Sequence, residues 1–389
     1  MPSMDLKVSF VSYTYPYPSR GYNPGIERLV EGLSEALVRK GVDLSVITSY
    51  RGGKKEFEVT PKGVRLFRAR SLARGIFAAS LASFSLMALK KYLSLMRNSD
   101  IISVFSASFI PIRPMKNLLP PIISYFTHLD RPNSIKELLY LPHVNFMLYL
   151  LYKYSDIIIA GNSPDSPQMR ELEEFLKVSR KKIRFSYEGV DAAKFNAKVD
   201  GTSIRDKFGE NMILYVGPLT PRKGLMYLVQ AIPKIVRETP DVKFVFAGKG
   251  EHESYLKNLS VKLGVEKHVF FEGFVSESLL PQYYSAADIF AFPSLKEGYP
   301  LVCLEAMACG TPVVATQLKN ISTLVGDTGI LVEQRNPDQL AKSIVQLLKE
   351  PTLRGRLGRR AEKRVEENFT WDKISRHLVE IYEEAMNLR

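Results

Sequence analysis

The 389-residue sequence has only two cysteines, and they do not suggest a disulfide. Cys303 and Cys309 stand six positions apart on one predicted helix, so their side chains point in different directions. Neither residue lies in a metal-ligand pattern. So little cysteine favours a reducing compartment, and we expect a cytoplasmic protein.

Long apolar runs are also missing. A membrane-spanning helix needs about 18–20 apolar residues, and the stretch nearest to that has fifteen, from Gly75 to Leu89. That length suits a buried or interfacial helix. The N-terminal run "LKVSFVSY" is short and has Asp5 ahead of it, which is typical of a first strand rather than a signal peptide.

The chain contains no Asp-x-Asp pair, so the sequence does not support a divalent metal held in that way. We therefore expect neither a metal nor another cofactor. The chain also has no internal repeat or low-complexity tract.

The net charge of +13 lies almost entirely in the first half. Residues 1–195 contain 28 Lys and Arg against 17 Asp and Glu, whereas residues 196–389 contain 26 against 24. Such a bias fits an anionic membrane, a nucleic acid or an acidic substrate, and it fits a solvated basic surface equally well. No nucleic-acid-binding module is recognisable, so we expect no nucleic-acid partner.

Short β-type runs alternate with helix-period segments along the chain, which predicts an α/β fold with parallel sheets covered on both faces. One series runs from "LKVSFVS" to "DIIIAG", and a second from "MILYVG" to "GILVE". Between them, Glu188–Glu210 has no strong apolar period, and we place the domain junction there. We expect two doubly wound, Rossmann-like domains facing across a cleft, the first being residues 1–195.

The stretch "PSLKEGYPLVCLEAMACGTPVVAT" predicts a strand end, a polar loop, a helix and a second buried strand. Pro300 suits the first helical position, and Gly310 suits the residue after the helix. Glu297 then lies in the loop and Glu305 on the helix, about 7–8 Å from its start. Free amides at a helix start favour phosphate, and carboxylates accept hydrogen bonds from sugar hydroxyls. A diphosphate with a glutamate on each side matches a nucleotide sugar; the alternative is two solvated charges.

A second candidate segment is "ILYVGPLTPRKGLMYLVQAI", which predicts a strand, a turn and a helix. Arg222 and Lys223, followed by Gly224, stand where the turn becomes helix. Cations there oppose the helix dipole unless an anion lies between, and both side chains suit a phosphate. The alternative is a basic surface turn.

With these motifs, the second half resembles the retaining glycosyltransferases of the GT-B fold, in the large family often numbered four (glycosyl transferases group 1). The resemblance rests on "EGYPLVCLEAMACGTPVVAT", with seven residues between its glutamates, on "GKGEHESYLKNLSVKLGVEKHVFFEGFV" and on "LLPQYYSAADIFAFPS". It covers most of Asn211–Asn387 and is looser in the first half. The closing "FTWDKISRHLVEIYEEAM" is similar to the family's last helix, which crosses back to the N-terminal domain. Residues 371–389 are therefore assigned to the first domain, and the second becomes 196–370.

The resemblance implies a hexosyltransferase that moves a sugar from a UDP- or GDP-sugar to an acceptor. It implies that Glu297 contacts the donor sugar, Glu305 the ribose, and Lys223 with Arg222 the diphosphate. The other implied donor-binding residues lie along the same edge: Gly217, the backbone near Tyr299, Leu301 and Val302, and Phe274 with Val275 beside the base. Phe274 has a packed strand end as its alternative.

In the first half, "SYTYPYPSRGYNPGIERLVEGL" resembles the family's glycine turn, which places helix-start amides by the donor phosphate. Many members have two adjacent glycines, whereas this chain has Pro24-Gly25, so Gly25 alone carries the match. "PIISYFTHLD" puts His128 where the family often has a histidine near the reacting centre, although a lone histidine is more often structural. Two further departures are Pro218, where the family often has arginine, and Glu188 in place of the asparagine of its "NGVD" hinge.

Retention in this family is usually explained by attack on the face that the leaving phosphate departs from, with that phosphate taking the acceptor proton. Such a reaction needs no strong side-chain base. Alternatives to transfer are a nucleotide-sugar-binding protein without activity and a nucleotide-sugar epimerase of the same architecture.

Two segments of the first half are candidates for a membrane surface. The apolar "RGIFAASLASFSLMALKKYLSLMRN" has basic residues at its ends, and "IKELLYLPHVNFMLYLLYKYSD" is rich in Leu and Tyr. That pattern is typical of helices on anionic membranes and also of helices that cover a sheet. We expect a glycan, lipid-linked or acidic acceptor and peripheral attachment at the cytoplasmic membrane face.

Overall fold

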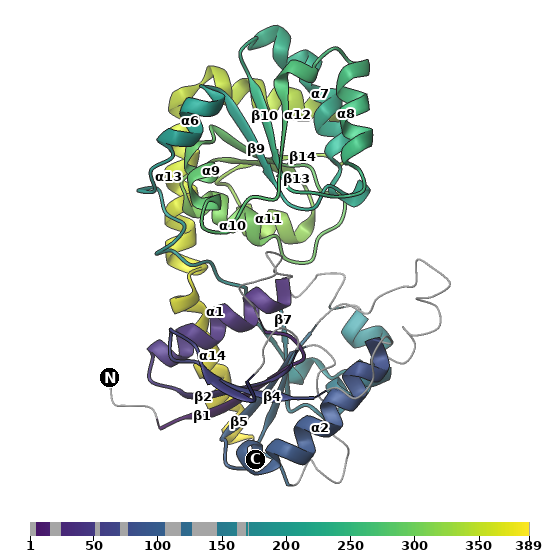
Figure 1. Cartoon of the computed structure of the whole chain (residues 1–389), viewed down its shortest axis with the longest axis vertical. Helices are drawn as coiled ribbons and strands as arrows, with labels where there is room; N and C mark the ends of the chain where they lie inside the picture. The colour runs from purple at the N-terminus through teal and green to yellow at the C-terminus, as the bar shows by residue number, and fades with distance from the viewer. Residues whose placement is uncertain are drawn as a thin grey trace. The chain divides into compact units, whose positions relative to one another are not determined.

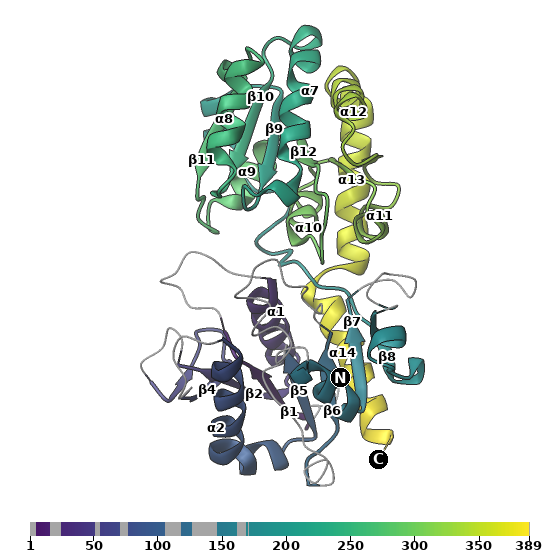
Figure 2. The same cartoon turned by 90° about the vertical axis from the view of Figure 1, so that its right-hand side faces the viewer.

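The computed structural model describes residues 5–15, 25–50, 55–70, 77–105, 118–126, 146–161, 169 and 171–388. The chain divides into two compact units, each built around its own sheet (Figures 1 and 2). The first unit is Met1–Gly189 with Trp371–Arg389, and the second is Val190–Thr370. The sequence-based junction at 195 falls a few residues further along the chain than this division.

In its described part, the first unit has an eight-stranded sheet in the order β3-β4-β2-β1-β5-β6-β7-β8. Neighbouring strands are parallel except β3 and β4. The strands are β1 (Lys7–Ser12), β2 (Asp43–Ser49), β3 (Phe57–Val59), β4 (Arg65–Ala69), β5 (Ile101–Phe105), β6 (Ile122–Tyr125), β7 (Ile157–Ala160) and β8 (Ile183–Phe185). The six longer strands confirm the sequence prediction. The three-residue β3 and β8 were not predicted, because a run so short shows no alternation.

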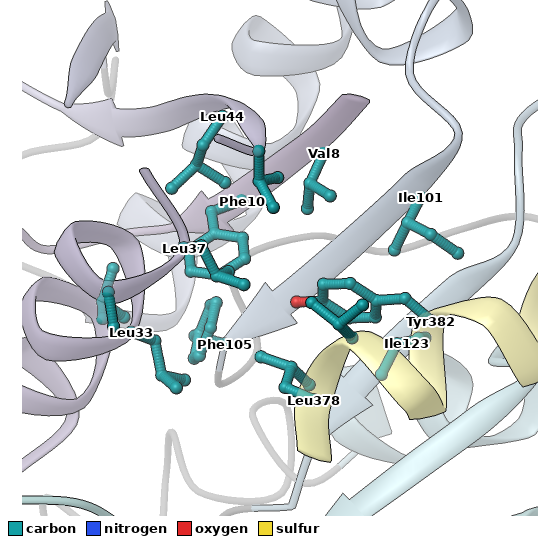
Figure 3. Close-up of a cluster of buried hydrophobic side chains, with 14 of the residues drawn as sticks. Val8, Phe10, Leu33, Leu37, Leu44, Ile101, Phe105, Ile123, Leu378 and Tyr382 are labelled. Atoms are coloured by element: carbon teal, nitrogen blue, oxygen red, sulfur yellow. The ribbon is translucent and has the colours of Figure 1, made fainter. Parts of the chain in front are cut away.

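Side chains of this sheet alternate between two hydrophobic cores, one on each face. On one face, Phe10 and Phe105 pack with the helices α1 (Gly25–Arg39) and α14 (Trp371–Asn387), as Figure 3 shows. On the other face, Val11 and Val104 pack with α2 (Phe77–Arg97) and with the helical residues 146–154. Burial on both faces explains why the strands are apolar almost throughout.

The C-terminal helix α14 completes the first unit, which confirms that the chain returns to its N-terminal domain. A Cβ atom on Gly32 of α1 would lie 2.1 Å from the Trp371 ring, and one on Gly189 would lie 2.6 Å from it. Tyr382 is fully buried, and its hydroxyl lies 2.8 Å from that of Ser103 on β5. The two glycines thus make the space that the indole fills.

The second unit has an all-parallel sheet in the order β11-β10-β9-β12-β13-β14. Its strands are β9 (Met212–Val216), β10 (Lys243–Ala247), β11 (Val269–Gly273), β12 (Ile289–Phe292), β13 (Val313–Thr316) and β14 (Ile330–Val332), all predicted. Its helices are α6 (Thr202–Phe208), α7 (Leu225–Glu238), α8 (Glu253–Lys262), α9 (Leu280–Ala286), α10 (Leu301–Ala308), α11 (Lys319–Val325), α12 (Pro337–Lys349) and α13 (Pro351–Asn368). The strand order reverses between β9 and β12, which makes their carboxyl ends the topological switch point.

Candidate functional site

The loops that follow β9 and β12 leave the sheet of the second unit at this switch point, where open α/β sheets bind ligands. After β9, the 3₁₀ turn η5 (Pro221–Lys223) leads through Gly224 into α7. After β12, Pro293–Pro300 leads into α10. The two segments singled out in the sequence are therefore neighbours in the fold.

Gly224 lets the two loops touch. Its φ is +66°, and an added Cβ atom would lie 2.1 Å from the carbonyl oxygen of Pro293. Beside it, the Leu295 amide donates to the Arg222 carbonyl at 2.8 Å. No other residue fits a position with both a left-handed backbone and so close a neighbour.

This contact brings Lys223 beside Glu297. Their side chains form an ion pair and are only 9% and 7% exposed. The Ser294 hydroxyl donates to the same Glu297 oxygen at 2.6 Å, and the ammonium group lies 5.3 Å from the centre of the Phe292 ring. A cation and a carboxylate are thus held at one point of the switch edge, largely shielded from water.

The loop that carries Glu297 is fixed from the next strand. The Asn320 side-chain amide, on α11, donates to the Glu297 carbonyl at 2.9 Å and also to that of Gly298. The Thr316 hydroxyl, at the end of β13, donates to the Ser294 carbonyl at 2.5 Å. Sequence reasoning missed both residues, because nothing in their spacing distinguishes them from other polar residues after a strand.

The helix α10 begins at Leu301, and Pro300 is its N-cap rather than its first residue as predicted. Gly310 follows the helix with φ +73°, as predicted. Glu305 lies on this otherwise apolar helix and is 4% exposed. Burial raises the pKa of the Cys303 and Cys309 thiols, that of Cys309 to about 12, and the Glu305 charge adds to both shifts. The free thiols therefore stay protonated at neutral pH.

Tyr284 holds the Glu305 carboxylate. Its hydroxyl donates to Oε2 of Glu305 at 2.8 Å, and the tyrosine itself is fully buried on α9. Sequence reasoning missed this residue too, since "QYYSAAD" offers two adjacent tyrosines and no sign of which one faces α10.

The carboxyl ends of β9, β10 and β11 form an edge rich in glycine. Gly217 has φ +145°, and a Cβ atom on Gly248 would lie 1.9 Å from the Gly217 carbonyl oxygen. Beyond β11, Phe274 is 52% exposed, and Val275 is partly exposed. The two glycines therefore allow the ends of β9 and β10 to approach each other closely, and the exposed Phe274 ring can stack on a flat group.

The remaining residues predicted for the donor lie at the same switch edge. Arg222 is exposed, next to the buried Lys223. Tyr299 and Val302 are partly exposed on either side of the start of α10. The Leu301 amide donates to the Tyr299 carbonyl at 3.1 Å in this structure, so it would have to change partner to bind a ligand.

Of the two site residues predicted in the first half, the structure describes one. Gly25 begins α1, while His128 lies outside the described residues. At the carboxyl ends of β5, β6 and β7, a cavity of about 60 Å³ is lined by Phe105, Tyr125, Glu188 and other residues. Burial raises the pKa of Glu188 to about 8, against a smaller opposing effect of Arg28.

In the described ranges, no group of three or more His, Cys, Asp and Glu side chains could hold a metal ion. The same ranges contain no helix with the length and apolarity that a bilayer crossing requires.

Comparisons with known proteins agree on one family. The family model "Glycosyltransferase Family 4" matches residues 24–194, and "Glycosyl transferases group 1" matches residues 202–364. An uncharacterized glycosyltransferase of Methanocaldococcus jannaschii is 30% identical over 98% of this chain and 99% of its own. The GDP-mannose-dependent monoacylated alpha-(1-6)-phosphatidylinositol monomannoside mannosyltransferase of Corynebacterium glutamicum is 32% identical over 53% of this chain and 59% of its own. Among solved structures, sucrose-phosphate synthase from Thermosynechococcus elongatus superposes with a TM-score of 0.78 at 20% identity, covering 99% of this chain and 100% of its own.

Proposed function

The chain belongs to the group 1 glycosyltransferases of family four and has their GT-B fold, and on that premise we propose that it is a retaining hexosyltransferase using a UDP- or GDP-sugar. Glycosyl transfer itself follows from the family. The identity of the donor, the retention of configuration and the acceptor belong to the proposal. The observation that carries it is the buried Lys223–Glu297 pair at the switch point.

In the proposed complex, the donor diphosphate lies at the start of α10, beside Lys223 and the exposed Arg222. Glu297 accepts hydrogen bonds from the sugar, and Glu305 accepts them from the ribose. The base lies along the edge that runs from Gly217 to Phe274 and Val275. Since an ion pair already holds Lys223 and Glu297 in place, the donor meets side chains that need little reorganisation.

Cleavage of the sugar–phosphate bond leaves a nucleoside diphosphate on which negative charge develops. We propose that Lys223, Arg222 and the amides at the start of α10 stabilise this charge without a metal ion, by electrostatic preorganisation. The acceptor attacks from the same face and transfers its proton to the leaving phosphate. His128 and the helix start at Gly25 are assigned to the reacting centre on the resemblance alone.

The acceptor is proposed to be lipid-linked or otherwise acidic, taken up at the cytoplasmic face of a membrane. The basic first half supports this proposal, and so does the phosphatidylinositol acceptor in the name of the corynebacterial relative.

Release of nucleoside diphosphate from UDP-, GDP- and ADP-hexoses, with and without candidate acceptors and with excess EDTA, tests the proposal. We expect one UDP- or GDP-sugar to turn over in EDTA, and Glu297→Gln and Lys223→Ala each to lower kcat/KM by about 100-fold or more. Lys349→Ala is the matched control, because its pair with Glu238 is about half exposed at the surface. Loss of activity in EDTA would reject the metal-free mechanism, and an inverted anomeric centre in the product would reject retention.

A further inference from the structure

The carboxylate of Glu305 is an unusual group for its surroundings. It lies on α10 among Leu301, Cys303, Leu304 and Met307, all buried, and is itself 4% exposed. A carboxylate removed from water costs free energy unless hydrogen-bond donors replace the water. The groups that donate hydrogen bonds to Glu305 therefore stabilise its buried carboxylate and set the direction in which it points.

Tyr284 supplies one such donor from a rigid position. Its ring packs against Phe195, at 5.9 Å between ring centres, and against Phe290, at 5.6 Å. Its carbonyl accepts a hydrogen bond of 2.6 Å from the Thr311 hydroxyl, in the segment just after α10. The hydroxyl of Tyr284 then donates to Oε2 of Glu305 at 2.8 Å.

From this arrangement we infer that Tyr284 is a positioning residue for donor binding, which sets the orientation in which Glu305 presents its carboxylate to the ribose of the nucleotide. The inference rests on the proposed function, in which Glu305 accepts hydrogen bonds from the ribose. One bond from a neutral hydroxyl does not exhaust an ionised carboxylate, which has about four acceptor sites. The phenol fixes the rotamer of Glu305, and the ribose hydroxyls use acceptor capacity that remains.

Such a role has a consequence that packing alone does not have. A carboxylate that points toward the ribose accepts hydrogen bonds from the ribose hydroxyls. The protein should therefore bind a ribonucleotide more tightly than its 2′,3′-dideoxy analogue. Without the phenol, the carboxylate loses a hydrogen bond that fixes its direction, and this preference should shrink more than the general affinity for nucleotides does.

The test measures dissociation constants by calorimetry for UDP, GDP and ADP and for their 2′,3′-dideoxy forms. For the nucleotide that binds best, Tyr284→Phe should reduce the preference for ribose by about tenfold, the scale of a hydrogen bond to a charged group. Glu305→Gln should reduce it as much or more, and the double variant no further. Tyr283→Phe is the matched control, since that buried tyrosine of the same helix donates to Glu272 instead.

A wild-type preference in Tyr284→Phe, together with its loss in Glu305→Gln, would overturn the inference and leave the proposed donor site intact. An unchanged preference in Glu305→Gln would overturn the ribose contact itself, and the inference with it. If Tyr284→Phe does not fold, Thr311→Val serves instead, because it removes the bond that fixes the Tyr284 backbone. That variant should lose part of the ribose preference, and full retention would again overturn the inference.

Discussion

Gly224 is a residue at which the backbone of the proposed donor site tolerates little change. Its φ of +66° strains any other residue, and a Cβ atom would meet the Pro293 carbonyl oxygen at 2.1 Å. Gly224→Ala should therefore push the loops after β9 and β12 apart. We expect it to lower the free energy of unfolding by about 2 kcal/mol or more and to separate Lys223 from Glu297, which weakens donor binding. Urea denaturation followed by circular dichroism, with nucleotide binding by calorimetry, measures both effects.

Gly264→Ala isolates the part of this effect that comes from the backbone alone. Gly264 has φ +67°, but nothing lies within 4 Å of an added Cβ atom. It should cost about 1 kcal/mol and leave nucleotide binding unchanged. Equal losses in the two variants would mean that the contact with Pro293 is unimportant.

Glu188 should make the stability of the first unit depend on pH. Burial raises the pKa of its carboxyl from 4.5 to about 8 in the folded state. Between those values the folded protein keeps a proton that the unfolded chain releases, so the free energy of unfolding falls as pH rises from about 4.5 to 8, by at most about 1.4 kcal/mol per unit. Glu188→Gln should remove this slope. Urea unfolding at several pH values, read from Trp371, the single tryptophan of the chain, measures it in the first unit, and an identical slope in both proteins would contradict the assignment.

Sequence order indicated those candidate residues whose position follows from the local order of strands, turns and helices. Lys223, Glu297 and Glu305 stand at fixed places relative to strand ends and helix starts, and the resemblance to the family joined them in one candidate site. The structure places Lys223 beside Glu297, and the roles of all three stay predictions. Tyr284 and Asn320 act across the fold, through hydrogen bonds to segments about twenty residues away in sequence. Such pairings depend on how neighbouring helices and loops pack, which spacing does not encode.

At the scale of elements, the packing of α1 against α14 depends on one missing side chain. Gly32 lies inside α1, where alanine would normally be favoured by up to about 1 kcal/mol. Here, however, a Cβ atom would lie 2.1 Å from the Trp371 ring. Gly32→Ala should instead destabilise the first unit by about 1–3 kcal/mol, because overpacking displaces the indole or the helix. Urea unfolding followed by Trp371 fluorescence measures the change.

The matched control is Gly355→Ala on α13. That glycine is also helical, and the nearest atom to its Cβ would be the end of the Arg359 side chain at 3.4 Å, which can move. It should be neutral or slightly stabilising. Stabilisation by Gly32→Ala as well would show that α14 can shift to make room.

The elements themselves were largely predictable, because their hydrophobic periods are strong. The apolar residues between positions 25 and 40 recur every three or four residues, which predicts a helix. The structure has α1 there, ending at Arg39, and Gly41 follows with φ +85°. The hydrophobic periodicity of a helix does not show which element packs against its apolar face. That α14 returns to the first unit came from the resemblance to the family, since helical amphipathicity does not say which sheet a helix packs on. That it covers the same face as α1 is known only from the structure.

For the whole molecule, charge distinguishes the two units more clearly than fold does. Both are open α/β sheets, yet the first unit carries 30 Lys and Arg against 20 Asp and Glu, and the second 24 against 21. Two units of similar fold but different charge suit different partners. This difference supports the proposal that the second unit binds the donor and that the first unit meets an acidic acceptor. The sequence could predict this bias but not the surface on which it acts.

The structure suggests one surface for that contact, on α2. Leu86 is 64% exposed, and Lys90 and Arg97, which follow it on the helix, are exposed as well. An exposed apolar side chain followed by cations on the same helix is suited to an anionic bilayer. We expect the full chain to float with vesicles that contain anionic lipid at about 0.05 M salt, to be released at about 0.5 M, and not to float with neutral vesicles.

Leu86→Ser with Lys90→Glu should weaken flotation severalfold without changing nucleotide binding, because α2 and the donor site belong to different units. Lys349→Glu, which reverses a charge in the second unit, is the control and should float as the parent does. Binding that is insensitive to salt would point to apolar insertion rather than charge. An absence of flotation at low salt would remove the membrane from the proposed function, and the acidic acceptor would then have to be sought among soluble molecules.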